Sequence, residues 1–232
     1  MARPKQRTAE LRDRVLVVAV STLLRDGAAG LTTREVARRA HTSTPAVYEL
    51  FGDKAGLVRE MFFEGFRMLG RRLDSLAGMR DARSALVATI LAFRRFILAY
   101  PDLAQLMFTR RFAEFDPGPE DLEAGAAVRR LVVSRVQRGI DDGLLAGDAT
   151  DVAHVLVSLT QGLAATELAG WLGRSRASRE RRWRLGIDAV LAGLAPARRT
   201  PRGDDRRRLP GTESSQRKLA SRKVSLTRSS TD

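Results

Sequence analysis

The stretch TTREVARRAHTSTPAVYELFGDKAGL, residues 32–57, contains two short helical patterns joined by a polar turn. Thr32 stands three residues before Glu35, which is the spacing of a capping box. In that motif the hydroxyl accepts a hydrogen bond from the Glu35 amide while the carboxylate reaches back to the N-cap. The pattern therefore predicts a helix that begins at Thr33 and ends near Ala40.

The second helical pattern follows the turn His41-Thr42-Ser43. Ser43 is a favourable N-cap, and Pro45 falls in the first helical turn, where a missing amide donor is tolerated. The side chains expected to face inward are Val47, Leu50 and Phe51. Two helices of about two turns each, joined by a short turn, are typical of a helix-turn-helix motif.

The outward side of this motif has the chemistry of a DNA-reading surface. In a helix-turn-helix the second helix enters the major groove with its N-terminal part toward the bases. Tyr48 can donate to a phosphate, and Lys54 adds a cation at the start of the next helix. The residues small and polar enough to lie against base edges and phosphates are Thr42, Ser43, Thr44, Pro45 and Ala46. Short helix pairs also occur in bundles that never touch DNA, so geometry alone leaves that alternative open.

The rest of the sequence predicts an all-α protein of about nine helices. Apolar residues recur at helical spacing, and no alternating strand pattern of useful length is present. Pro101 should end a helix at Tyr100, and FDPGPED should be a loop. Besides the two short helices, the expected helical ranges are 8–26, 53–73, 86–100, 102–111, 122–142, 148–172 and 177–194.

The composition excludes several kinds of site. The 232 residues contain no cysteine, which excludes disulfides, thiolate metal sites and thiol nucleophiles. The two histidines, His41 and His154, lie far apart, so we expect no metal and no cofactor. No catalytic-triad spacing, nucleophile elbow or glycine-rich phosphate loop is evident, so we do not expect an enzyme.

No apolar run approaches the roughly 20 residues that a membrane-spanning helix needs. The basic N-terminus leads into an amphipathic stretch without the apolar core of a secretory signal. We therefore expect a cytoplasmic protein with no membrane partner.

Positive charge is concentrated at the two ends of the chain. The formal net charge is +14, and residues 197–232 contain eleven Lys or Arg and four Asp or Glu. This segment has almost no apolar periodicity, so we expect a disordered basic tail, which either keeps the protein soluble or contacts nucleic acid without sequence preference. At the N-terminus the candidates for phosphate contacts are Arg3, Lys5, Arg7, Arg12 and Arg14. A non-specific DNA-packaging protein is the alternative that this charge leaves open.

The segment LTTREVARRAHTSTPAVYELFGDKAGLV resembles the DNA-binding domain of the tetracycline-repressor (TetR) family, and the resemblance covers about residues 8–60. It implies that Thr33 and Arg34 face phosphates, that residues 43–46 approach bases, and that Tyr48 and Lys54 contact the DNA backbone. The chain departs from the family pattern in the turn, where His41 stands in place of the usual Gly. It departs again at Pro45 and Ala46, where Gly and Thr are frequent.

The remainder, residues 61–196, resembles the family's regulatory domain more weakly, through YPDLAQLMF and GLAATELAGWL. The resemblance implies a repressor that leaves a palindromic double-stranded DNA operator when a small-molecule effector binds. It also implies a homodimer through residues 149–172 and 177–194, although an internal core would show the same small and apolar positions. Candidates for an effector pocket are Phe93, Phe96, Met107, Phe108, His154, Gln161 and Trp171, but such residues at helical spacing are more often ordinary core.

Overall fold

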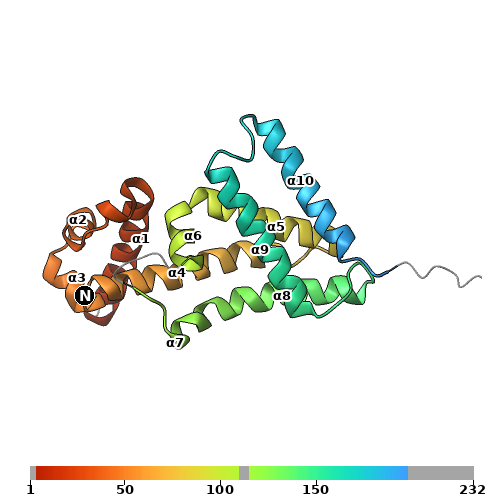
Figure 1. The fold of residues 1–232 in the computed structure, drawn as a ribbon. Coiled ribbons are helices and arrows are strands. Elements are labelled where there is room, and N and C mark those ends of the chain that lie inside the picture. Colours follow the sequence, from red (N-terminus) through yellow and green to blue (C-terminus); the bar gives the residue numbers. More distant parts are fainter. Residues whose placement is uncertain (1–3, 110–114, 198–232) are drawn as a thin grey trace, which may run out of the picture. The chain divides into compact units, whose positions relative to one another are not determined.

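The computed structural model describes residues 4–109 and 115–197, and these residues are almost entirely helical (Figure 1). The expected tail, from residue 198 onward, and the end of the helix expected over 102–111 lie outside the described residues. The elements are α1 (Pro4–Gly30), α2 (Thr33–Arg39), α3 (Thr44–Phe51), α4 (Lys54–Asp74), α5 (Ala82–Ala99), α6 (Pro101–Phe108), α7 (Pro119–Leu122), η1 (Glu123–Gly125), α8 (Ala126–Asp141), α9 (Ala149–Leu168) and α10 (Arg176–Gly193). The all-α prediction is confirmed.

Side-chain caps start α4 and α9 where the expected ranges begin, at Asp53 and Asp148. The Asp53 carboxylate accepts a hydrogen bond from the Gly56 amide at 2.7 Å, and Asp148 accepts from the Thr150 amide at 2.8 Å. Each carboxylate also lies at the positive end of a helix dipole, which favours it there. At the other end, α5 stops at Ala99 with Tyr100 as its C-cap, directly before Pro101.

Several helix boundaries differ from the prediction. α1 runs from Pro4 to Gly30 rather than over 8–26, and α5 begins at Ala82, after the N-cap Asp81, rather than at residue 86. The stretch expected to be a loop contains the single turn α7, in which Pro119 occupies a first-turn position and the Asp121 carboxylate accepts from the Gly118 amide at 3.0 Å. The helix expected from Leu122 therefore begins as α8 only at Ala126. α9 ends at Leu168 rather than near residue 172, because Gly170 adopts the left-handed conformation with φ 79°.

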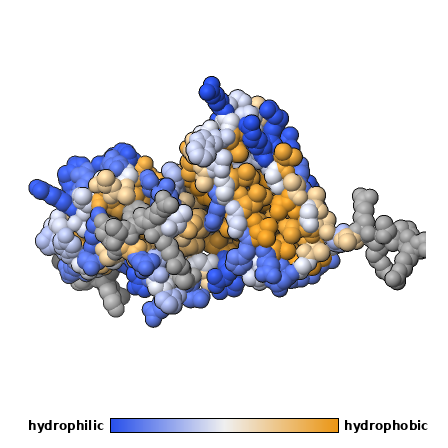
Figure 2. Space-filling model, in the orientation of Figure 1, coloured by the Kyte–Doolittle hydropathy of each residue, from blue (hydrophilic) through white to orange (hydrophobic). Residues whose placement is uncertain are grey.

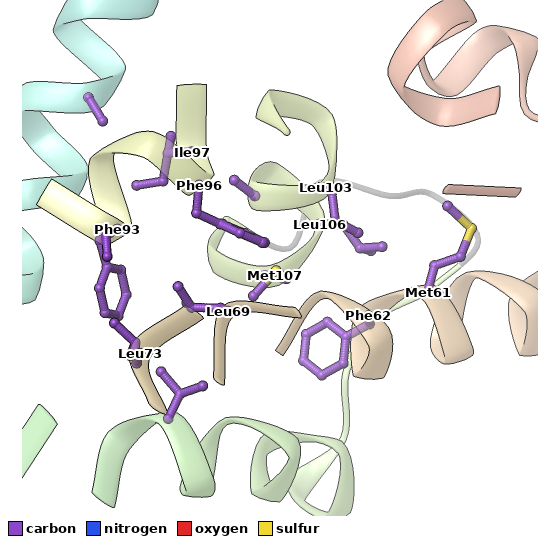
Figure 3. Packing of buried hydrophobic residues seen from close by; sticks show 14 of the residues in the cluster. Met61, Phe62, Leu69, Leu73, Phe93, Phe96, Ile97, Leu103, Leu106 and Met107 are labelled. Carbon is purple, nitrogen blue, oxygen red and sulfur yellow. The ribbon is translucent and has the colours of Figure 1, made fainter. Parts of the chain in front are cut away.

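Helix α4 passes between α6 and α8 and connects the first three helices to the rest of the described chain (Figure 1). Its buried side includes Met61, Phe62, Leu69 and Leu73, which pack with Leu103, Leu106 and Met107 of α6 (Figure 3). Gly65 allows this close approach, since a Cβ atom there would overlap the Met107 sulfur.

Polar contacts hold α4 along its length. Near the start, Arg59 Nε lies 2.5 Å from Asp121 Oδ1, and Arg12 of α1 pairs with Glu60 at 2.8 Å. At the far end, the buried Arg135 of α8 donates to the carbonyl of Leu73 at 2.5 Å. A cation at a helix C-terminus is favoured by the helix dipole. Polar contacts therefore hold α4 near both of its ends.

Candidate DNA-reading surface and regulatory cavities

The turn between α2 and α3 is closed by its own backbone. His41 has φ 52°, the left-handed conformation that glycine adopts most readily and that histidine tolerates better than most residues. The Thr42 amide donates to the Ala37 carbonyl at 3.0 Å, which fixes the turn. The helix-turn-helix geometry is therefore reached with His41 at this position.

The two caps predicted for the motif form, one of them only in part. The Ala46 amide donates to Ser43 Oγ at 3.3 Å, and the Glu35 amide donates to Thr32 Oγ1 at 3.2 Å. The expected reach of the Glu35 carboxylate back to the N-cap is wrong: the carboxylate pairs instead with Arg38 at 2.6 Å and Arg39 at 2.5 Å. The hydrogen bond from Arg38 holds the pKa of Glu35 below its ordinary value.

The start of α2 and the outer face of α3 meet at one hydrogen bond. Thr33 Oγ1 and the Tyr48 hydroxyl lie 3.2 Å apart, and the Tyr48 side chain is 45% exposed while its neighbour Val47 is fully buried. The opposite burial of these neighbours fixes which side of α3 faces outward. A phosphate at this point would meet two hydroxyl groups already held together.

The nine residues between Thr33 and Lys54 that are predicted to contact DNA have accessible side chains. The exposed ones are Arg34, Ser43, Pro45 and Tyr48, and the half-buried ones are Thr33, Thr42, Thr44, Ala46 and Lys54. None of these nine side chains lies in the core, so all of them are accessible to a ligand at this face of α2 and α3.

Two of the arginines expected to contact phosphate are engaged within the protein. Arg12 pairs with Glu60 and lies over the Phe51 ring, 5.1 Å from its centroid. Arg14 Nε donates to the Ala40 carbonyl at the end of α2, at 3.1 Å. Both side chains hold α1 against its neighbours, a role that the charge pattern did not reveal. The side chains of Arg3, Lys5 and Arg7 lie outside the described residues.

A cavity of about 300 Å³ lies among α4, α5, α8 and α9, and we call it the α8 cavity. Four of the seven predicted pocket residues line it: Phe93, Phe108, His154 and Gln161. Further apolar walls come from Phe66, Val128 and Val157, and Arg129 contributes the charged side chain. Such a mostly apolar cavity with a few polar groups is typical of a small-molecule site.

A second cavity of about 350 Å³, the α6 cavity, lies between α6 and α9 and extends to the end of α5. It shares Phe108 and Gln161 with the α8 cavity, and its other walls include Ile97, Ala104 and Leu168. The sequence did not predict this second space, because Gln105 and Thr109 at its rim belong to no recognisable pattern.

The other three predicted pocket residues line neither cavity. Phe96 is fully buried beside Tyr100, with ring centroids 5.3 Å apart, and Met107 is buried against Gly65. Trp171 follows the end of α9 and is 85% exposed. Phe96 and Met107 belong to the core because they face α4. Trp171 is on the surface because α9 ends before it.

Apolar side chains also lie exposed on α9, on α10 and in the turn between them. Figure 2 shows apolar surface gathered around α9. The large exposed side chains here are Val155, Leu168, Trp171 and Leu185. They fall within the two ranges predicted to pair in a dimer.

A nearly buried cluster of charges joins α5, α9 and α10. Arg94 bonds to both oxygens of Glu167 at 2.9 Å, and the Trp183 indole donates to the same carboxylate at 2.7 Å. Burial alone would raise the pKa of Glu167, but the hydrogen bonds from Arg94 and Trp183 outweigh it and leave the pKa below its ordinary value.

The described part of the chain contains neither a candidate membrane-spanning helix nor a candidate metal site. None of its helices is long and apolar enough to cross a membrane. No group of three or more acidic or histidine side chains there is placed to hold a metal ion.

Comparison with known proteins connects both halves of this arrangement to one family. The family model described as bacterial regulatory proteins of the tetR family matches residues 15–61, and the tetracyclin repressor-like C-terminal domain matches residues 86–190. The chain is 30% identical over 160 residues to the class A tetracycline repressor of transposon 1721 from Escherichia coli, covering 67% of this chain and 66% of that protein. It is 30% identical over 158 residues to the Escherichia coli class C repressor, covering 68% of this chain and 66% of that protein. The chain thus spans just under two thirds of the length of these relatives.

Solved structures agree with this relationship. A protein from Rhodococcus sp. RHA1 is 31% identical with a TM-score of 0.69, covering 80% of this chain and 96% of that one. A TetR variant from Acinetobacter baumannii AYE, solved in complex with minocycline, shares the fold at 21% identity with a TM-score of 0.55, covering 77% of this chain and 93% of that one. The helix-turn-helix, the helical bundle and these matches together show that the chain belongs to the tetR family of bacterial regulatory proteins.

Proposed function

We propose that this protein is a sequence-specific transcriptional repressor that leaves a palindromic DNA operator when a small-molecule effector binds. The two Escherichia coli proteins that this chain resembles are tetracycline repressors, which are regulators rather than enzymes. The observation that carries the proposal for this chain is the outward face of α2 and α3, where Thr33 and Tyr48 are joined beside an uncharged, accessible helix start. As a DNA-binding regulator, the protein acts in the cytoplasm.

In this proposal the roles on the DNA divide between phosphates and bases. Thr33, Arg34, Tyr48 and Lys54 hold phosphates, and residues 42–46 at the start of α3 approach base edges. Phosphate contacts position a protein without reading sequence, whereas base contacts specify it. The Ser43 oxygen already accepts the Ala46 amide, which leaves its hydroxyl hydrogen for the DNA.

The division into parts follows from these roles. We assign residues 8–60 to DNA binding, residues 61–196 to effector binding and dimerisation, and the basic residues from 197 onward to non-specific contact. The homodimer forms through residues 149–172 and 177–194. The exposed Val155, Leu168 and Leu185 support this interface, because apolar side chains of this size on neighbouring helices favour burial against another surface.

The effector belongs in the cavities of the helical bundle. Their apolar walls and few polar groups support an apolar or amphipathic small molecule. An effector releases DNA only to the extent that it binds the DNA-free conformation more tightly. A coupling of about 1–3 kcal/mol changes operator affinity about 5- to 150-fold.

Selection of bound duplexes from a random pool tests the proposal. A dimer with one reading helix per subunit should select two inverted half-sites about one helical turn apart. Salt titrations on the selected and a random duplex then separate repressor from packaging protein: a repressor keeps a large affinity ratio between them. A single asymmetric half-site, a monomer in light scattering, or equal affinity for both duplexes would contradict it.

A further inference from the structure

The α8 cavity has an uneven distribution of charge. Its walls are mostly apolar, and the polar side chains that line it are the exposed Arg129 and His154, together with Gln161 two helical turns further along α9. Arg129 is exposed and makes no ion pair with any residue that the structure describes. No acidic side chain lines either cavity within that same part of the chain. An anionic group entering the α8 cavity would therefore meet a cation that has no acidic partner among the residues that the structure describes.

A hydrogen bond to the backbone of α9 fixes which ring nitrogen of His154 is available to a ligand. Its Nδ1 lies 2.8 Å from the Thr150 carbonyl, which can only accept, so Nδ1 carries a hydrogen. The other ring nitrogen, Nε2, is left for a ligand. This nitrogen can form one hydrogen bond with an acid group in the cavity.

The α6 cavity has the opposite character. Its described lining contains no charged side chain, and the walls formed by Ile97, Ala104 and Leu168 are apolar. The two cavities meet at Phe108 and Gln161, which line both. At about 350 and 300 Å³, each alone lies near the lower end of the range of about 300–1,000 Å³ for small-molecule sites.

We infer that the effector is a single elongated molecule with an apolar chain and one terminal acid group, and that it occupies both cavities. The acid group binds at Arg129 and His154, and the chain passes Phe108 into the α6 cavity. This rests on the proposed function in assigning the cavities to the effector. It adds the polarity of the ligand, its orientation and the route between the cavities.

Binding to the full chain without DNA tests the polarity. The probes are straight-chain carboxylic acids of increasing length and the primary alcohols of matched length, each below its micelle-forming concentration, measured by calorimetry. We expect the acids to bind about tenfold more tightly than the matched alcohols, because an ionised group strengthens a hydrogen bond. Arg129→Gln should remove this preference, whereas Arg130→Gln, at the exposed neighbour outside the cavity, should keep it. Equal affinity for acids and alcohols in the unmodified protein would overturn the inference.

Chain length tests the route. Gln105 is exposed and lines only the α6 cavity, so Gln105→Trp fills that space without a change in the core. Long acids should lose about tenfold or more in affinity in this variant while short acids keep theirs, and Gln105→Ala should retain both. A uniform loss across all lengths, or no loss at any length, would show that the cavities do not form one site.

The operator assay is separate and distinguishes the two proposals. Acids that bind in the expected pattern and leave operator affinity unchanged would support the ligand class and contradict effector-induced release. A neutral molecule that binds and releases the operator, with no binding of any acid, would leave the proposed function standing and overturn the ligand class.

Discussion

The first three helices and the bundle of α5, α9 and α10 use polar contacts at different ranges. In α1–α3, Arg14 bonds to Ala40, 26 residues away, and Thr33 meets Tyr48, 15 residues away, both at least partly in solvent. In the bundle, Arg94 reaches Glu167 and Glu180, 73 and 86 residues away. The Arg94 and Glu167 side chains are only 10% and 9% exposed. The contacts of α1–α3 described here are thus at least partly exposed and span shorter stretches of the chain, whereas α5, α9 and α10 are joined by a nearly buried cluster as well as by exposed pairs such as Arg83 with Asp188.

The largest expected effect comes from breaking the buried cluster. Arg94→Ala leaves Glu167 nearly buried without its main partner, and we expect a loss of about 3–5 kcal/mol in the free energy of unfolding. The matched control is Arg83→Ala, because Arg83 and Asp188 pair at 2.6 Å with both side chains about half exposed. Exposed pairs contribute about 0–1 kcal/mol. Urea unfolding of both variants measures the difference, and equal losses would remove the distinction between buried and exposed contacts.

A smaller effect is expected within α4. Gly65→Ala forces Met107 to move, and overpacking of this kind costs about 1–3 kcal/mol. Gly70→Ala on the same helix meets only Val128 at 3.9 Å, so it should stabilise by about 0.5–1 kcal/mol through helix propensity. Thermal unfolding reports both, and a gain at Gly65 would show that the α4–α6 contact is looser than described.

The reading surface should respond more weakly still, and only in DNA binding. Tyr48→Phe removes the hydroxyl that meets Thr33, and we expect a loss of about 0.5–1.5 kcal/mol in binding, equal for every duplex. Lys54→Ala should reduce the salt slope by roughly one. Substitutions at Thr44 and Ala46 should instead change which duplex is preferred. Fluorescence anisotropy on specific and random duplexes separates the two outcomes, and the reverse pattern would mean that α3 is oriented differently on DNA.

The smallest effect on stability should follow removal of the basic tail. Deletion of residues 197–232 is expected to leave the melting temperature and the preferred operator nearly unchanged and to lower affinity for all duplexes together. Calorimetry and anisotropy on the truncated protein test this. A large drop in melting temperature would mean that the tail contributes to folding.

The sequence predicted those structural features that depend only on residues close together in the chain. Ser43, Asp53 and Pro101 determine where helices begin or end because a cap or a proline acts within one turn. It did not separate Phe93, which lines a cavity, from Phe96, which is core, since both lie on the apolar side of α5 and only the packing of α4 distinguishes them.

Long-range pairing was the other limit of prediction. Arg12 and Arg14 look like phosphate ligands in a basic N-terminus, yet their partners Glu60 and Ala40 are 48 and 26 positions further along. The Arg94 cluster left no local signal either, because its members lie on three separate helices.

Arg135 anchors the Leu73 end of α4, whereas the contacts near its start, Arg59 with Asp121 and Arg12 with Glu60, involve more exposed arginines. In the proposed switch, α4 acts as a lever arm that breaks these contacts when it tilts. Its 21 residues span about 30 Å at a rise of 1.5 Å per residue. A tilt of about 10° around the fixed end would carry the Lys54 end sideways by roughly 5 Å, more than the 3.4 Å that separates successive base pairs. A ligand that shifts Phe66, at the wall of the α8 cavity, by a fraction of that distance acts on the arm near its middle. In the proposed switch, small displacements in the bundle would therefore be converted into a misalignment of about one base pair at α3.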